Sequence, residues 1–347
     1  MKIGNKIRQM RKKAGYTQEQ LAEKLGVTAQ SISKWENEIS MPDISLLPFI
    51  AEAFGISIDE LFDLTIEQKI KRIQNRIEIE EELSEQTFKE YESFLKAQLS
   101  EGKNRIEILS LLASLYHHRM EADCRRVSKY GREAILLDPA KKNCQWLLVK
   151  AEGHAVWDWN VSNHSSAIDF YKDAIAADKI APKSPLPYYY LIDNLLADNR
   201  LSEAEYYINE MAKLPAAKSV LVEVYAAYLS LLRHNVEQAN KIIDACVAEH
   251  PDNSDALFEA AQYYARQCEY DKAIELYERA WAVEKTPRFT DALQGIAAIY
   301  KIRGDKQLVS MTYDRLLECL KTEWGYSPED LPYAEVVREK MLSLKEK

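Results

Sequence analysis

The chain of 347 residues has few of the residues that break helices and no long hydrophobic run. Its 10 Gly and 11 Pro are too few for frequent tight turns, which counts against a fold of many short strands. No stretch approaches the roughly 18 consecutive apolar residues of a membrane span, and the charged N-terminus lacks the apolar core of a signal peptide. We therefore expect a cytoplasmic protein that does not enter a membrane.

Cysteine and histidine are also too scattered to form a known metal motif. The five cysteines include no CxxC pair and predict small buried residues in a reducing compartment. His117, His118 and the stretch 157–164 lack a second ligand pair at a known spacing. The GxSxG, HExxH, P-loop and GxGxxG motifs are absent as well, so we expect no metal, no cofactor and no enzymatic activity. The cysteines are Cys124, Cys144, Cys246, Cys268 and Cys319.

What the chain has in abundance is helix-forming residues: Leu, Ala, Glu and Lys dominate, together with 20 Tyr. This composition predicts an all-α protein with aromatic packing. The length suggests two or three domains at roughly 100–200 residues each. We place the boundaries so that residues 1–65 form a first domain, 66–105 connector helices and 106–347 a repeat domain.

The formal net charge of -9 hides a local asymmetry. Residues 1–35 contain eight Lys and Arg against two Glu, a local charge of +6. Residues 36–64 contain seven acidic residues and no Lys or Arg. The positive charge is therefore concentrated where a nucleic-acid phosphate backbone could be bound.

Helix signals divide the first 64 residues into five short helices, the first at about 3–13. Thr17 and Gln20 stand at capping-box spacing and begin the second helix, while Gly26 forms the turn that follows it. Thr28 caps the third helix. The remaining boundary signals are Gly15, Asp43, Gly55 and Ser57.

The stretch TQEQLAEKLGVTAQSISKWENEISMPDISLLPFIAEAFGISIDELF, from Thr17 to Phe62, closely resembles the XRE-type (phage lambda and 434 repressor-like) DNA-binding domain. The resemblance covers about residues 3–64 and implies a five-helix domain whose third helix enters the major groove of double-stranded DNA. Carried over residue by residue, it places Ala29, Gln30, Ser33 and Lys34 on base edges. It places Gln18, Thr28 and the backbone near Asn37 on phosphates.

The chemistry of these residue types suits those roles. Gln30 can bind adenine through two hydrogen bonds, and Lys34 can bind guanine acceptors or, alternatively, a phosphate. Ala29 can contact only a thymine methyl group. The resemblance also implies a structural pair between Glu36 and Arg11, which removes that arginine from DNA contacts.

Two features adjoin this motif: the loop after Asn37 and the helix that follows the first domain. The family often has a glycine and a basic residue after the Glu-Asn pair, whereas Glu38 follows here. Because an acidic side chain repels a nearby phosphate, this loop is poorly suited to phosphate contacts. After the first domain, Ile66, Ile70, Ile73 and Ile77 repeat at 4-3-4 spacing in a charged helix. They indicate a short coiled coil or, as we prefer, a connector helix that packs on the next domain.

Beyond residue 105 the sequence repeats itself at the spacing of tetratricopeptide (TPR) repeats. The segment 254–287 carries small and aromatic residues in the TPR pattern, and six such segments begin at 108, 148, 185, 220, 254 and 290. Stacked helix pairs predict a right-handed solenoid with a concave surface. Residues 320–347, capped at Ser327, are expected to close it.

A DNA-binding head of this type followed by a TPR-like array resembles the peptide-sensing (RRNPP-type) regulators. The resemblance implies a homodimer on a palindromic operator, controlled by a peptide or protein in the concave groove. A TPR interaction scaffold and an antitoxin or phage-immunity regulator with a protein partner remain alternatives. The groove candidates, which could also be packing residues, are Tyr116, Arg119, Glu152, Trp159, Asn160, Tyr189, Asp193, Asn194, Tyr228, Gln262, Arg266 and Lys301.

Overall fold

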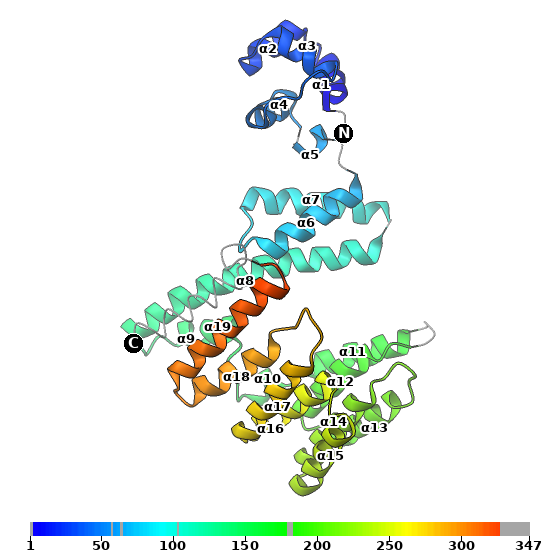
Figure 1. The fold of residues 1–347 in the computed structure, drawn as a ribbon, viewed down its shortest axis with the longest axis vertical. Coiled ribbons are helices and arrows are strands. Elements are labelled where there is room, and N and C mark those ends of the chain that lie inside the picture. The colour runs from blue at the N-terminus through cyan, green and yellow to red at the C-terminus, as the bar shows by residue number, and fades with distance from the viewer. Residues whose placement is uncertain (1–2, 57, 63–64, 103, 179–182, 327–347) are drawn as a thin grey trace. The chain divides into compact units, whose positions relative to one another are not determined.

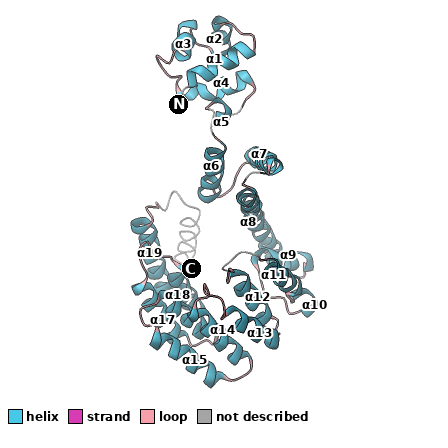
Figure 2. Ribbon diagram, turned by 90° about the vertical axis from the view of Figure 1, so that its right-hand side faces the viewer, coloured by secondary structure: helices cyan, strands magenta, loops and turns pink. Residues whose placement is uncertain are grey.

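The computed structural model describes residues 3–326 except 57, 63–64, 103 and 179–182. The chain divides into two compact units, Met1–Asp123 and Cys124–Lys347. Every regular element among the described residues is a helix, as Figures 1 and 2 show, which confirms the all-α prediction. None of the described helices is long and apolar enough to cross a membrane.

The first part of unit 1, here called the head (residues 3–62), has the five predicted helices. Thr17 and Gln20 form the predicted capping box of the second helix, and Gly26 ends that helix in the left-handed conformation with φ of 66°. Thr28 accepts a hydrogen bond from the backbone N–H of Ser31 and begins the third. The helices are α1 (Ile3–Lys13), α2 (Gln18–Leu25), α3 (Ala29–Glu36), α4 (Leu47–Phe54) and α5 (Ile58–Leu61).

Asp43 does not begin the fourth α-helix directly, as the sequence predicted. It caps a short 3-10 turn, Ile44–Leu46, and α4 follows from Leu47. Pro48 lies in the first turn of α4, where its missing N–H would have had no partner in any case. The predicted cap at Ser57 lies outside the described residues.

The head is held together by a small core that includes Ile7, Leu21 and Ile32. Helices α1 and α3 approach closely at Gly4: a Cβ there would stand 1.9 Å from the carbonyl oxygen of Trp35. Only a residue without a side chain fits between the two backbones. Trp35 is buried at 6% exposure and belongs to the same core.

After the head, α6 (Ile66–Ile79) packs with α7 (Glu85–Glu101) and α8 (Arg105–Leu137) around a separate core. Ile70 and Ile73 are buried in this core, and Ile77 packs against it. The isoleucine spacing is therefore used for packing on α7 and α8, as the connector interpretation expected.

The first two predicted repeats, at 108 and 148, are not paired TPR helices. Residues 105–137 form one continuous helix of 33 residues, because the segment contains no proline and its one glycine, Gly131, lies within the helix. Pro139 comes only after the helix has ended. The next elements are irregular in length: α9 (Lys142–Glu152), α10 (Trp159–Ser162) and α11 (Ser165–Ala177).

The last four repeats form four helix pairs whose starts lie within one residue of the predicted positions. The first helices of neighbouring pairs contact one another, and the second helices do so less, so the first helices line the inner side of the curve. At one crossing a Cβ on Gly295 would lie 2.6 Å from the ring of Tyr277. The pairs are α12 (Leu186–Ala197) and α13 (Leu201–Met211), α14 (Ser219–Leu232) and α15 (Val236–Glu249), α16 (Ser254–Arg266) and α17 (Tyr270–Val283), and α18 (Asp291–Ile302) and α19 (Lys306–Glu323).

The close approach at Gly4 gives a first prediction. Gly4→Ala forces α1 away from α3 and should destabilise the head by at least about 2 kcal/mol, the cost of overpacking a tight contact. Hydrogen exchange of the α1–α3 amides in the full chain measures this. Gln9→Ala, on the exposed face of α1, is the matched control and should change protection little; equal protection in both variants would contradict the packing argument.

Candidate DNA interface and concave groove

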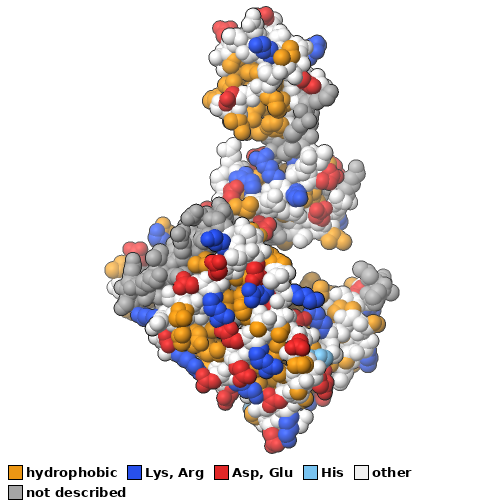
Figure 3. Space-filling view, viewed as in Figure 1, with side chains coloured by type: hydrophobic (Ala, Val, Ile, Leu, Met, Phe, Trp, Pro, Cys, Tyr) orange, Lys and Arg blue, Asp and Glu red, His pale blue; other side chains and the backbone are white. Residues whose placement is uncertain are grey.

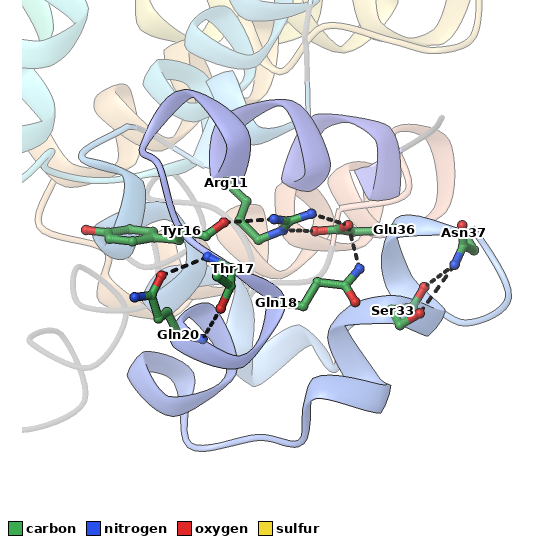
Figure 4. Close-up of polar contacts among 8 residues, drawn as sticks. All are labelled: Arg11, Tyr16, Thr17, Gln18, Gln20, Ser33, Glu36 and Asn37. Atoms are coloured by element: carbon green, nitrogen blue, oxygen red, sulfur yellow. Dashed lines mark hydrogen bonds and ion pairs between the residues drawn. The ribbon is translucent and has the colours of Figure 1, made fainter.

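A buried ion pair joins the three helices that present the DNA-binding motif (Figure 4). Arg11 of α1 donates from Nε to Oε1 of Glu36 at 2.5 Å and from Nη2 to Oε2 at 2.9 Å. Its Nη1 donates to the carbonyl oxygen of Tyr16, and Gln18 of α2 donates to the same carboxylate at 2.9 Å. Glu36 is only 3% exposed. The predicted Arg11–Glu36 pair is therefore present and fixes α3 against α1 and α2.

The hydrogen bonds determine the ionisation of this site. Burial by itself raises the pKa of Glu36, but the bonds from Arg11 and Gln18 and the nearby positive charges outweigh it. The pKa of Glu36 therefore lies below its ordinary value of 4.5, and the pair is ionised at neutral pH.

Two of the four predicted base readers point freely outward from α3. Gln30 and Lys34 are exposed, and neither side chain has a hydrogen-bond partner among the described residues. Ala29 is half-buried and packs against the head core, and Ser33 is half-buried beside it. Gln30 and Lys34 thus offer their full hydrogen-bonding capacity to an external partner, whereas Ala29 and Ser33 offer only part of their surface.

The predicted phosphate contacts are all partly engaged inside the head. Gln18 is held by Glu36, and the Thr28 oxygen accepts the capping bond from Ser31 at 3.1 Å. Asn37 ends α3 and donates from Nδ2 to the carbonyl oxygen of Ser33 at 2.9 Å. Their roles toward phosphates stay predictions, and each residue has at least one structural role as well.

The loop after Asn37 has little to offer a phosphate. Glu38 adopts a left-handed backbone with φ of 60° and accepts a hydrogen bond from Asn5 at 3.0 Å. Hydrophobic side chains gather on the face of the head visible in Figure 3. The exposed large hydrophobic residues of this region are Ile39, Met41, Ile44 and Phe49. An acidic residue and exposed apolar side chains make this surface poorly suited to a phosphate, as the sequence indicated.

The structure brings together the predicted groove residues of the regular array. Tyr189 and Asp193 lie on α12, Tyr228 on α14, and Gln262 and Arg266 on α16, all first helices that line the inner side. The Arg266 guanidinium lies over the Tyr228 ring, 5.9 Å from its centroid. Five of the candidates therefore share one continuous surface.

Two further residues of this surface were not predicted from the sequence. Tyr225 donates to Asp193 at 3.0 Å, and Glu259 lies near Asp193 and Arg266. Desolvation by the surrounding surface raises the pKa of Asp193, and the bond from Tyr225 offsets part of that rise. Desolvation also raises the pKa of Glu259, with a further contribution from the negative charge of Asp193. The TPR pattern alone does not single out Tyr225 and Glu259. They could have been predicted only by assigning each residue of α14 and α16 to the inner or outer face of its helix.

The inner side also has a cavity of about 160 Å³ beside α16 and α18. Its walls combine carboxylates with two aromatic rings. Lys218 forms an ion pair with one of these carboxylates, Asp255. The lining residues are Ser254, Asp255, Phe258, Glu259, Ala280, Glu284, Phe289, Asp291 and Ala292. Sequence periodicity did not reveal this cavity, because its walls come from three helices and a loop.

The remaining groove candidates do not join this surface through any described contact. Tyr116 and Arg119 belong to unit 1, where Tyr116 bonds to Glu92 and Arg119 lies over the Phe88 ring. Asn194 donates to the carbonyl oxygen of Tyr190 within its own helix at 2.7 Å. Three further candidates have exposed side chains: Trp159, Asn160 and Lys301. Glu152 forms an ion pair with Arg132.

Comparisons with known proteins agree with this division of the chain. Residues 7–61 match the helix-turn-helix family and residues 230–296 the tetratricopeptide repeat family. The HTH-type transcriptional activator BcrR of Enterococcus faecalis is 43% identical over 61 residues, which are 18% of this chain and 30% of BcrR. The cryptic phage CTXphi transcriptional repressor RstR of Vibrio cholerae is 30% identical over 99 residues, 28% of this chain and 88% of RstR.

These matches and the geometry of the head define a helix-turn-helix domain followed by a helical-repeat array. The chain belongs to the helix-turn-helix family of transcriptional regulators. A solved structure of Bacillus thuringiensis PlcR in complex with the peptide PapR7 and DNA is 15% identical and covers 87% of this chain and 98% of PlcR. Its TM-score of 0.28 is too low to carry an inference about this chain.

The buried pair predicts a loss of head stability in acid. Glu36→Gln should destabilise the head by about 2 kcal/mol at neutral pH, because it removes a charge from a hydrogen-bonded buried pair. In the unmodified chain, this stabilisation is complete above the ordinary pKa of 4.5 and is lost as the pH falls through the lowered pKa of Glu36. Hydrogen exchange of α1–α3 as a function of pH should show that acid-dependent loss diminished in the variant. Glu52→Gln, on the exposed side of α4, should behave like the unmodified chain; a similar loss of protection in both variants would count against the pair.

Proposed function

We propose that this protein is a cytoplasmic transcription regulator that binds operator DNA as a homodimer and responds to a peptide in the groove of its array. The exposed, unpartnered Gln30 and Lys34 on a helix clamped by Arg11–Glu36 carry the DNA-binding part of the proposal. A rigid helix with free polar ends is what reading of base edges requires, because each hydrogen bond to a base must be accurately directed.

Positive charge around α3 supports binding to DNA. With Arg11 engaged by Glu36, the exposed Lys12 and Lys13 at the end of α1 and Lys24 at the end of α2 can neutralise phosphates. Such contacts supply affinity for any DNA sequence, and Gln30 and Lys34 then supply discrimination between sequences. One head offers few contacts, so two linked heads on two half-sites would raise the affinity through effective concentration.

The chemistry of the inner side supports a peptide as the ligand of the array. Arg266 is exposed and supplies hydrogen-bond donors, whereas Asp193 supplies an acceptor. The aromatic face of Tyr228 lies beside them. An extended peptide carries both donors and acceptors along its backbone, so a surface of mixed donors, acceptors and rings suits it.

Binding in this groove would control the heads by a shift between two conformations of the array. A ligand that contacts α12, α14 and α16 together favours the curvature at which all three can be reached. In a dimer, a change of curvature alters the spacing of the two heads and therefore their fit to the two half-sites. The ligand needs only a differential affinity for the two conformations to act.

DNA reading is tested by selection of binding sites from random duplexes. Gln30→Ala should relax the preference at one base position of each half-site, with a cost of about 1–3 kcal/mol at the preferred base. Lys12→Ala should instead weaken binding to all sequences evenly and reduce the slope of log affinity against log salt by about 1. Absence of any sequence preference in the unmodified chain would reject the regulator proposal, and an asymmetric recovered site would reject the homodimer.

The sensing proposal is tested with a library of short random peptides displayed on phage. The full chain should enrich related peptides, and Arg266→Ala should weaken their binding at least about tenfold, the effect of removing a charged hydrogen bond. Arg279→Ala, on the outer helix α17, is the matched control and should retain binding. If no peptide is enriched while operator binding is intact, the groove has a protein partner or none, and the peptide proposal fails.

A further inference from the structure

Three metal-binding side chains meet at the second regular helix pair of the array. Glu223 comes from α14, Glu249 is the last residue of α15, and His250 follows it as the C-terminal cap. One ligand atom from each residue lies within 4.8 Å of the other two. Glu249 and His250 are adjacent in the chain, whereas Glu223 precedes Glu249 by 26 positions. The pairing of α14 with α15 therefore brings the three residues together.

No internal cation accounts for this arrangement. None of the three side chains forms an ion pair with Lys or Arg among the described residues. Two carboxylates that lie this close repel each other, and a cation bound between them relieves that repulsion.

A buried thiol neighbours one of the carboxylates. Cys246 lies one turn before His250 on α15, and its side chain is buried close to Glu223. Groups that surround the ligands of a metal site orient the ligand side chains.

The spacing and donor types point to a transition-metal ion. Bonds of about 2.0–2.2 Å to nitrogen and oxygen place two donors of a tetrahedral ion roughly 3.4 Å apart. Donors already within 4.8 Å reach this geometry by small side-chain rotations. Imidazole favours zinc and its neighbours over calcium or magnesium, which prefer oxygen ligands alone.

We propose that Glu223, Glu249 and His250 bind one divalent transition-metal ion, of which Zn²⁺ is the probe used below. The ion would tie the C-terminal end of α15 to α14, the helix that also carries Tyr228 of the groove. The sequence predicted no metal because it showed no ligand pair at a familiar spacing; here the helix pairing supplies the third ligand. This proposal is independent of the function proposed above.

The test is calorimetric titration of the full chain with Zn²⁺ after removal of bound metal by a chelator. We expect saturable binding of one ion per chain and a higher melting temperature with Zn²⁺, because a ligand that binds only the folded state stabilises it. His250→Ala and Glu223→Gln should each weaken binding at least about tenfold and abolish the shift in melting temperature.

Two matched variants keep the result decisive. His154→Ala removes an exposed histidine outside the cluster, and Glu237→Gln removes an exposed acid elsewhere on α15; both should bind Zn²⁺ like the unmodified chain. Circular dichroism without metal should show the same helicity in every variant. The proposal is overturned if the unmodified chain does not bind Zn²⁺ saturably, if both cluster variants bind it unchanged, or if His154→Ala loses binding equally.

Discussion

The buried pair of Arg11 and Glu36 is the interaction on which the DNA-facing surface depends. It links the end of α1 to the end of α3, and through Gln18 it includes the start of α2. A charge buried in this way is stable only while its partners stay in place, so the pair couples the three helices tightly. The orientation of Gln30 and Lys34 follows from that coupling, because both lie on the helix whose last residue is Glu36.

The array depends on a different constraint, the stacking of neighbouring helix pairs. Alanines let the helices approach, and Gly295 of α18 leaves room for the ring of Tyr277 of α17 where two neighbouring pairs meet. Because the first helices of neighbouring pairs lie side by side on the inner side, their polar residues converge on one surface. Asp193, Tyr225, Glu259 and Arg266 form a charged and aromatic groove for that reason, without any single motif that encodes it.

The local signals of the chain were predicted accurately, and the interpretation failed where a local signal was ambiguous. Thr17, Thr28 and Gly26 each determine a helix end through a bond or a backbone angle within a few residues. The repeat spacing found the last four helix pairs. It misread residues 105–137, because helix-forming residues with no proline between them continue a helix even where a turn would suit the repeat.

The sequence by itself determined the helix-rich class, the resemblance of the head to XRE-type domains, and the positions where most helices begin and end. These depend on side chains and backbone groups that are close along the chain. The tertiary structure alone decided which polar groups are already engaged and which remain available. Gln18 is held by a carboxylate 18 residues away, and Gly4 is required by a carbonyl on another helix. Hydrogen bonds and close contacts between distant segments exist only once the helices have packed, so no reading of neighbours along the chain could assign them.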